Sequence, residues 1–154
     1  MDCVAWHPNC NYIFSGSSDS TVRMWSYPDA KCVRLFPAGK AGIRSVAASP
    51  DGKLAASAGE DRKVRVWDLA QGGLIKELRG HQQCEVTDLV WCQDSRLLVS
   101  GATDGSVKVW DTGVGVDTGQ EVVGQFSCGP NTSVLSSHFT DTNTLIVTAI
   151  EFCQ

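Results

Sequence analysis

Short apolar runs alternate with turn-forming residues along the whole chain, in the pattern that is typical of β-strands. Between residues 97 and 110, for example, an apolar run, a Thr-Asp-Gly-Ser turn and a second run rich in valine follow one another. Asp-Gly favours the positive φ of a two-residue hairpin turn, and β-branched and aromatic residues favour strands. No segment has the periodicity of an amphipathic helix. The pattern therefore predicts an all-β fold made of antiparallel hairpins.

The same hairpin occurs three times at a nearly constant interval. Each copy ends at a tryptophan, and Trp25, Trp67 and Trp110 lie 42 and 43 residues apart. An aspartate precedes each tryptophan by six positions, and a serine precedes each aspartate by four. These pairs are Ser15 and Asp19, Ser57 and Asp61, and Ser100 and Asp104. A repeat of about 40–45 residues with four strands per unit is the signature of a propeller blade.

The repeat predicts about three and a half four-stranded antiparallel blades, that is, an incomplete β-propeller. The blades fall at about residues 2–37, 42–79 and 84–126, with a partial blade at 133–150. A Gly-rich stretch at 112–120 predicts a loop. Because closed propellers have about four to eight blades, we interpret the chain as the C-terminal part of a longer propeller, or as a truncated gene model. In this interpretation the missing strands precede Met1.

Composition argues against several classes of function. The net charge is −4 and no basic run is present, which disfavours direct binding of nucleic acid. No apolar run is long enough to span a membrane, and no signal peptide precedes the first strand. The seven cysteines include no C-x-x-C pair, so we expect free, buried thiols in a reducing compartment. Metal-binding, phosphate-binding and nucleophile-elbow motifs do not occur, so no cofactor and no small-molecule substrate is predicted.

Two Trp-Asp dipeptides, ending at Asp68 and Asp111, and a Gly-His pair ending at His81 resemble the marks of WD-repeat proteins. The first copy ends in Trp-Ser instead, and Gly39 stands where the second blade would carry its histidine. Over nearly the whole chain, segments such as VAWHPNCNYIFSGSSDSTVRMWS resemble the last blades of the WD-repeat subunits of TFIID and of SAGA-type histone acetyltransferase complexes. This resemblance implies a nuclear, non-catalytic scaffold that holds histone-fold subunits together in RNA polymerase II transcription.

The resemblance also implies that the repeated polar residues form a buried hydrogen-bond chain in each blade. In the third blade the chain consists of His81, Ser100, Asp104 and Trp110. The incomplete sets are Ser57, Asp61 and Trp67 in the second blade, and Ser15, Asp19 and Trp25 in the first. A Ser-His-Asp set also suggests nucleophilic catalysis, but Ser100 lies inside a predicted strand rather than on an exposed turn. We therefore prefer the structural interpretation to an enzyme.

Several other residues leave two interpretations open. Trp6 and Trp91 occupy equivalent positions and either fill space between blades or contact a partner. We expect His7 to be a surface or turn residue. Four cations close together in the sequence form either a solvated face or a docking patch for an acidic partner: Arg44, Arg62, Lys63 and Arg65.

The main alternative to a transcription scaffold is a WD-repeat receptor for a linear peptide, such as a histone tail, or a substrate adaptor. Such a receptor needs an aromatic-lined central pocket on a closed ring, and the predicted blades are too few to show one. Both interpretations make proteins the partners of this chain.

Overall fold

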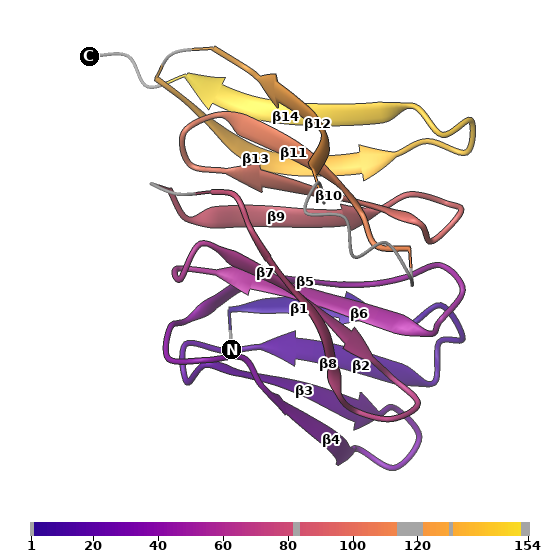
Figure 1. Ribbon diagram of the computed structural model, residues 1–154. Coiled ribbons are helices and arrows are strands. Elements are labelled where there is room, and N and C mark those ends of the chain that lie inside the picture. Colours follow the sequence, from indigo (N-terminus) through magenta and orange to yellow (C-terminus); the bar gives the residue numbers. More distant parts are fainter. Residues whose placement is uncertain (1, 82–83, 114–121, 130, 152–154) are drawn as a thin grey trace.

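The computed structural model describes residues 2–81, 84–113, 122–129 and 131–151, which fold into antiparallel β-sheets. The sheets are stacked in chain order from the N-terminal to the C-terminal end (Figure 1). The predicted fold class, an incomplete propeller of four-stranded antiparallel blades, is confirmed. The described residues include no helix long and apolar enough to cross a membrane. Residues 114–120 of the predicted Gly-rich loop lie outside the described part of the chain.

Three sheets have four strands each, paired in sequence order, and are called blades 1, 2 and 3 here. Blade 1 contains β1 (Cys3–Trp6), β2 (Tyr12–Gly16), β3 (Thr21–Ser26) and β4 (Lys31–Pro37). Blade 2 contains β5 (Ile43–Ala48), β6 (Leu54–Gly59), β7 (Lys63–Asp68) and β8 (Leu74–Arg79). Blade 3 contains β9 (Val86–Trp91), β10 (Leu97–Ala102), β11 (Ser106–Asp111) and β12 (Val122–Ser127). A partial blade contains β13 (Thr132–Phe139) and β14 (Leu145–Glu151).

The second and third strands of each of the three four-stranded blades are joined by the same kind of turn. Ser20, Arg62 and Gly105 occupy equivalent places in these turns and have φ angles of 66°, 64° and 73°. The amide of each donates to the carbonyl three residues earlier, so each residue ends a β-turn and is left-handed. Only one residue per turn has a positive φ. The two-residue hairpin turn predicted at Asp104-Gly105 is therefore wrong, and a longer turn with a left-handed last residue replaces it.

A β-bulge marks each repeated tryptophan. The register between the third and fourth strands of each blade shifts at the step into Trp25, Trp67 and Trp110. A bulge bends its strand and re-aims the side chain that follows. Trp67 and Trp110 are 3% and 1% exposed, whereas Trp25 is only half-buried.

The hydrophobic core consists of layers between successive blades rather than one central cluster. Phe14 and Phe36 of blade 1 pack with Ile43 and Trp67 of blade 2. Further layers lie between blades 2 and 3 and between blade 3 and the partial blade. Each blade is thus stabilised by its neighbours, as expected for a stacked repeat.

The two tryptophans at equivalent inner-strand positions have different surroundings. Trp91 is 4% exposed and packs against blade 2, where its indole N–H donates to the carbonyl of Ala47 at 3.3 Å. Trp6 is 54% exposed and meets the ring of Tyr27 edge-on, with 5.6 Å between the ring centroids. Trp91 therefore fills space between blades, and Trp6 does not do so in the described structure.

The turns between the first and second strands link each blade to the next. His7 Nε2 lies 3.1 Å from the carbonyl of Gly52, and the amide of Asp51 donates to Ser95 Oγ at 3.0 Å. The corresponding turn of blade 3 contacts Asn143 in the partial blade. His7 lies in the turn after β1, as one of the two alternatives predicted, but it is only 8% exposed and so is not a surface residue. Its ring is buried because it bonds across to the neighbouring turn.

The six cysteines in the described residues are free thiols, but most are not buried. Cys92 is the buried one, and Cys10, Cys32 and Cys128 are exposed. The expectation of uniformly buried thiols is therefore wrong for the outer turns and strands.

Candidate functional site

The repeated polar residues of blade 3 form a continuous hydrogen-bond chain. Trp110 Nε1 donates to Ser100 Oγ at 2.8 Å, and the same hydroxyl lies 2.7 Å from His81 Nε2. On the other side of the imidazole, Nδ1 lies 3.1 Å from Ser106 Oγ. A neutral imidazole satisfies both contacts, because one ring nitrogen donates and the other accepts. The structure thus brings His81, Ser100 and Trp110 together, and each is at most 3% exposed.

Asp104 joins this chain through Ser106 rather than by a direct hydrogen bond to His81. An oxygen of Asp104 accepts from the amide of Ser106 at 2.9 Å, and Ser106 contacts the imidazole. The role of Ser106 was not predicted from the sequence. The sequence feature that could have indicated this role is the aspartate two residues earlier, which all three blades share. The equivalent amides of Thr21 and Lys63 also donate to the aspartates of their own turns. These contacts are Asx turns, which an aspartate two residues earlier favours.

His81 is held in its neutral form. Burial lowers the pKa of His81 to about 4, and the nearby Lys108 charge acts in the same direction. The Asp104 carboxylate opposes this change less strongly. Protonation would place a charge in a buried site whose hydrogen bonds are already made.

The free energy of unfolding of the protein should therefore fall as the pH is lowered from about 7 to 5. Unfolded histidine titrates at about pH 6.5, so below that pH the unfolded state binds a proton that the folded state does not. His81 should contribute a slope of up to about 1.4 kcal/mol per pH unit until the pH approaches its folded value. Urea unfolding at several pH values would measure the slope, which His81→Gln should largely remove. Equal slopes for the unaltered protein and for His81→Gln would rule out His81 as the responsible group.

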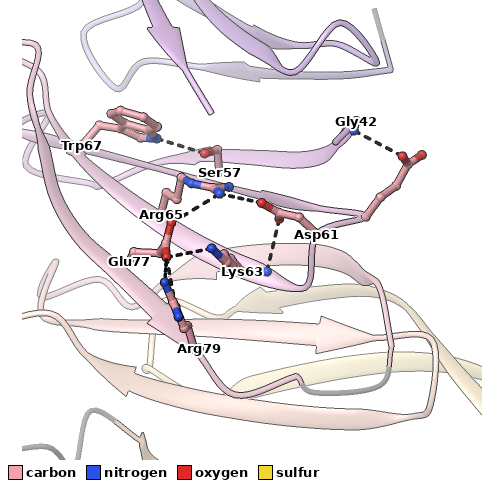
Figure 2. Close-up of polar contacts among 9 residues, drawn as sticks. Gly42, Ser57, Asp61, Lys63, Arg65, Trp67, Glu77 and Arg79 are labelled. Atoms are coloured by element: carbon pink, nitrogen blue, oxygen red, sulfur yellow. Dashed lines mark hydrogen bonds and ion pairs between the residues drawn. The ribbon is translucent and has the colours of Figure 1, made fainter. Parts of the chain in front are cut away.

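Blade 2 keeps the tryptophan–serine contact and replaces the histidine. Trp67 Nε1 donates to Ser57 Oγ at 2.9 Å (Figure 2). Gly39, the residue expected in place of the histidine, has a φ of 111°, and a Cβ there would lie 2.9 Å from Arg65 Nη2. The guanidinium of Arg65 therefore occupies space beside Gly39 that a side chain would otherwise fill.

Arg65 is the centre of an ion-pair network in blade 2 (Figure 2). Its Nη2 lies 2.5 Å from Asp61 Oδ2 and 3.4 Å from Glu77 Oε2, and its side chain is 6% exposed. Lys63 Nζ and Arg79 Nη2 pair with Glu77 at 2.9 and 2.7 Å. Hydrogen bonds from Lys63 and Arg79 lower the pKa of Glu77 to about 2. Arg65 Nη1 is buried and has no hydrogen-bond partner among the described residues.

Blade 1 carries a more exposed version of the same arrangement. Trp25 Nε1 donates to Ser15 Oγ at 2.8 Å. Asp19 pairs with Arg23, which is equivalent to Arg65, at 2.8 Å, and the two side chains are 45% and 38% exposed. The first two blades therefore share the contacts but differ in how far water reaches them.

The four cations considered as a docking patch do not form one continuous surface. Arg65 is buried, which corrects its assignment to an exposed patch. Lys63 is paired with Glu77, and Arg44, half-exposed, has an Nη2 that lies 2.9 Å from a carboxylate oxygen of Glu60. Arg62 is exposed and lies in the left-handed position of its turn. The ion pairs of Arg44, Lys63 and Arg65 reduce the charge that this region presents to a partner.

The serine–histidine pair of blade 3 is closed to a substrate. Ser100 is 0% exposed and its hydroxyl is bonded to both Trp110 and His81. A nucleophile must reach the atom that it attacks, within about 3–3.5 Å. The geometry therefore favours a link between strands over nucleophilic catalysis.

Comparison with known proteins gives a consistent family match. The family described as "WD domain, G-beta repeat" matches residues 2–26, 30–68 and 72–111, which together exceed half of the chain. The three matched stretches contain the repeated tryptophans Trp25, Trp67 and Trp110.

Three curated relatives are similar to this chain at modest identity. Angio-associated migratory cell protein of Pongo abelii is 32% identical over 128 residues, covering 82% of this chain. Small ribosomal subunit protein RACK1y of rice is 32% identical over 117 residues, covering 72%. Transcription initiation factor TFIID subunit 5 of Caenorhabditis elegans is 31% identical over 117 residues, covering 75%. The matches span 28%, 33% and 18% of these relatives, so the chain corresponds to a third or less of their length.

Proposed function

Because the chain belongs to the WD40 repeat family, we propose that it is a non-catalytic scaffold on which other proteins assemble. Domains of this family mediate protein–protein interactions and are generally not catalytic. The observation that carries the proposal is the buried chain from Trp110 through Ser100 to His81, which uses the reactive side chains internally. What remains for function is the surface of the blades, where apolar side chains such as Val33 and Val123 are exposed on outer strands.

We further propose that this scaffold belongs to a nuclear transcription complex of the TFIID or SAGA type. The similarity to TFIID subunit 5 supports this proposal, although other relatives are similar at the same level. The proposed partners are histone-fold subunits, which bind through protein surfaces. A net charge of −4 supports protein rather than nucleic-acid partners.

Affinity purification from nuclear extract tests this proposal. The tagged chain should enrich subunits of transcription initiation or coactivator complexes, including histone-fold proteins, by at least about tenfold over a tag-only control. Trp110→Ala, which disrupts blade 3, should reduce that recovery. Enrichment of splicing or ribosomal proteins instead, or recovery of the chain without partners, would contradict the assignment to transcription.

A further inference from the structure

A groove with a volume of about 760 Å³ lies between blades 1 and 2. Met24 and Leu69, which are buried, line it together with the half-buried Leu54. Val33 of β4 and Ile75 of β8 also line it, and they are 48% and 38% exposed. The volume falls within the range of about 300–1,000 Å³ that is usual for binding sites.

The groove is lined by two cations, Arg34 and Lys53, and by one carboxylate, that of Asp68. Arg34 Nη2 donates to the carbonyl of Ala70 at 2.9 Å, which fixes the guanidinium beside the groove. The acidic lining residue, Asp68, already accepts hydrogen bonds from two backbone amides of its own turn. The ammonium of Lys53 forms no ion pair within 4.0 Å in the described part of the chain, and Asp51 acts on it only at longer range. A ligand carboxylate would therefore find a cation that no internal partner satisfies.

A smaller groove lies in the equivalent place between blades 2 and 3. Its volume is about 250 Å³. Arg96 precedes β10 as Lys53 precedes β6, and Asp111 follows the repeated tryptophan as Asp68 does. Arg96 Nη2 pairs with Asp111 Oδ2 at 2.9 Å, whereas Lys53 and Asp68 form no such pair. Lys53 lines both grooves, and the larger groove is the one in which the ion pair equivalent to Arg96–Asp111 is missing.

We propose that the groove between blades 1 and 2 docks an extended segment of a partner protein that carries a carboxylate next to an aliphatic side chain. The aliphatic side chain packs on Met24, Leu54 and Leu69 between the exposed side chains of Val33 and Ile75. The carboxylate pairs with Lys53. This surface goes beyond the scaffold role proposed above and does not depend on which complex the chain joins.

Selection from a random linear peptide library displayed on phage, with the full chain as bait, tests this inference. Peptides with Asp or Glu close to Leu, Ile or Val should be enriched. The most enriched peptide, labelled with fluorescein, should bind at least about tenfold more weakly to Lys53→Glu and to Ile75→Asp in anisotropy titrations. A peptide whose acidic residue is changed to lysine should regain affinity for Lys53→Glu.

Matched variants outside the groove serve as controls. Lys31→Glu reverses an exposed charge at the start of β4, and Val123→Asp alters an exposed valine, 56% exposed, on the outer strand of blade 3. Both should bind the peptide as the unaltered chain does, and circular dichroism should show all variants folded.

Four results would overturn the proposal. These are no enrichment, enrichment of basic or purely apolar peptides, equal binding by the groove variants and controls, or self-association of the chain that Ile75→Asp abolishes. The last result would mean that a second copy occupies the groove. Peptide binding is measured on the isolated chain, so its outcome is separate from that of the affinity purification.

Discussion

Replacing Trp110 by alanine should lower the free energy of unfolding by about 3–5 kcal/mol. The indole is 1% exposed and packs in the layer between blades 2 and 3. Its fit is tight, since a Cβ on Gly80 would lie 2.5 Å from the ring. Truncation leaves a cavity and also removes the donor that Ser100 accepts from, which weakens the chain to His81.

Urea unfolding followed by circular dichroism would measure this loss. Trp110→Phe retains most of the ring but lacks the N–H, so it should cost about 1–2 kcal/mol and separate packing from hydrogen bonding. Trp6→Ala is the matched control, because Trp6 is 54% exposed and its loss should cost less than about 1 kcal/mol. A loss below about 1 kcal/mol for Trp110→Ala would contradict the buried placement of the indole.

Arg65→Ala should lower the free energy of unfolding by about 3 kcal/mol, because it removes the cation of a buried pair. Asp61 lies 2.5 Å from the guanidinium and is 20% exposed, so its carboxylate loses an ion-pair partner where water reaches it only in part. The truncation also empties the space beside Gly39 that the guanidinium fills. Both the unpaired carboxylate and the new cavity destabilise blade 2.

Arg23→Ala gives the matched comparison, since Arg23 makes the equivalent pair with Asp19 in an exposed setting. That change should cost less than about 1 kcal/mol, and added salt should remove most of the difference. The cost of Arg65→Ala, measured in the same way, should change little with salt because the pair is shielded from solvent. Similar costs for the two variants would show that burial does not distinguish the pairs.

The period of the chain predicted much of the fold because each repeat carries its own turn and strand signals. The turn before the third strand of each four-stranded blade places an aspartate before a left-handed residue, and that strand ends one residue after a bulged tryptophan. These signals are local, so they can be identified without knowing the neighbouring blades. The contact between Trp110, Ser100 and His81 could be expected for the same reason, together with the resemblance to WD repeats.

What the sequence did not predict depends on contacts between segments that are far apart. Trp6 and Trp91 occupy equivalent positions, but their burial differs because only Trp91 has a described blade to pack against. His7 was expected at the surface or in a turn, and its burial in that turn was not predicted because its contact with Gly52 spans 45 residues. The guanidinium of Arg65 fills the space beside Gly39, where a Cβ would lie 2.9 Å from Nη2. The spacing of residues in the sequence does not predict this contact.

The turns between the first and second strands of neighbouring blades contact one another, and these contacts restrict how the blades can move. The turn at residues 51–52 bonds to His7 on one side and to Ser95 on the other, so one short segment ties three sheets along one rim. Sliding of one blade past the next along its strands would break these bonds. The outer strands add further bonds, from Arg34 to the carbonyl of Ala70 and from Lys76 to the carbonyl of Gly113, so a ligand that separates two blades has to break bonds at more than one edge.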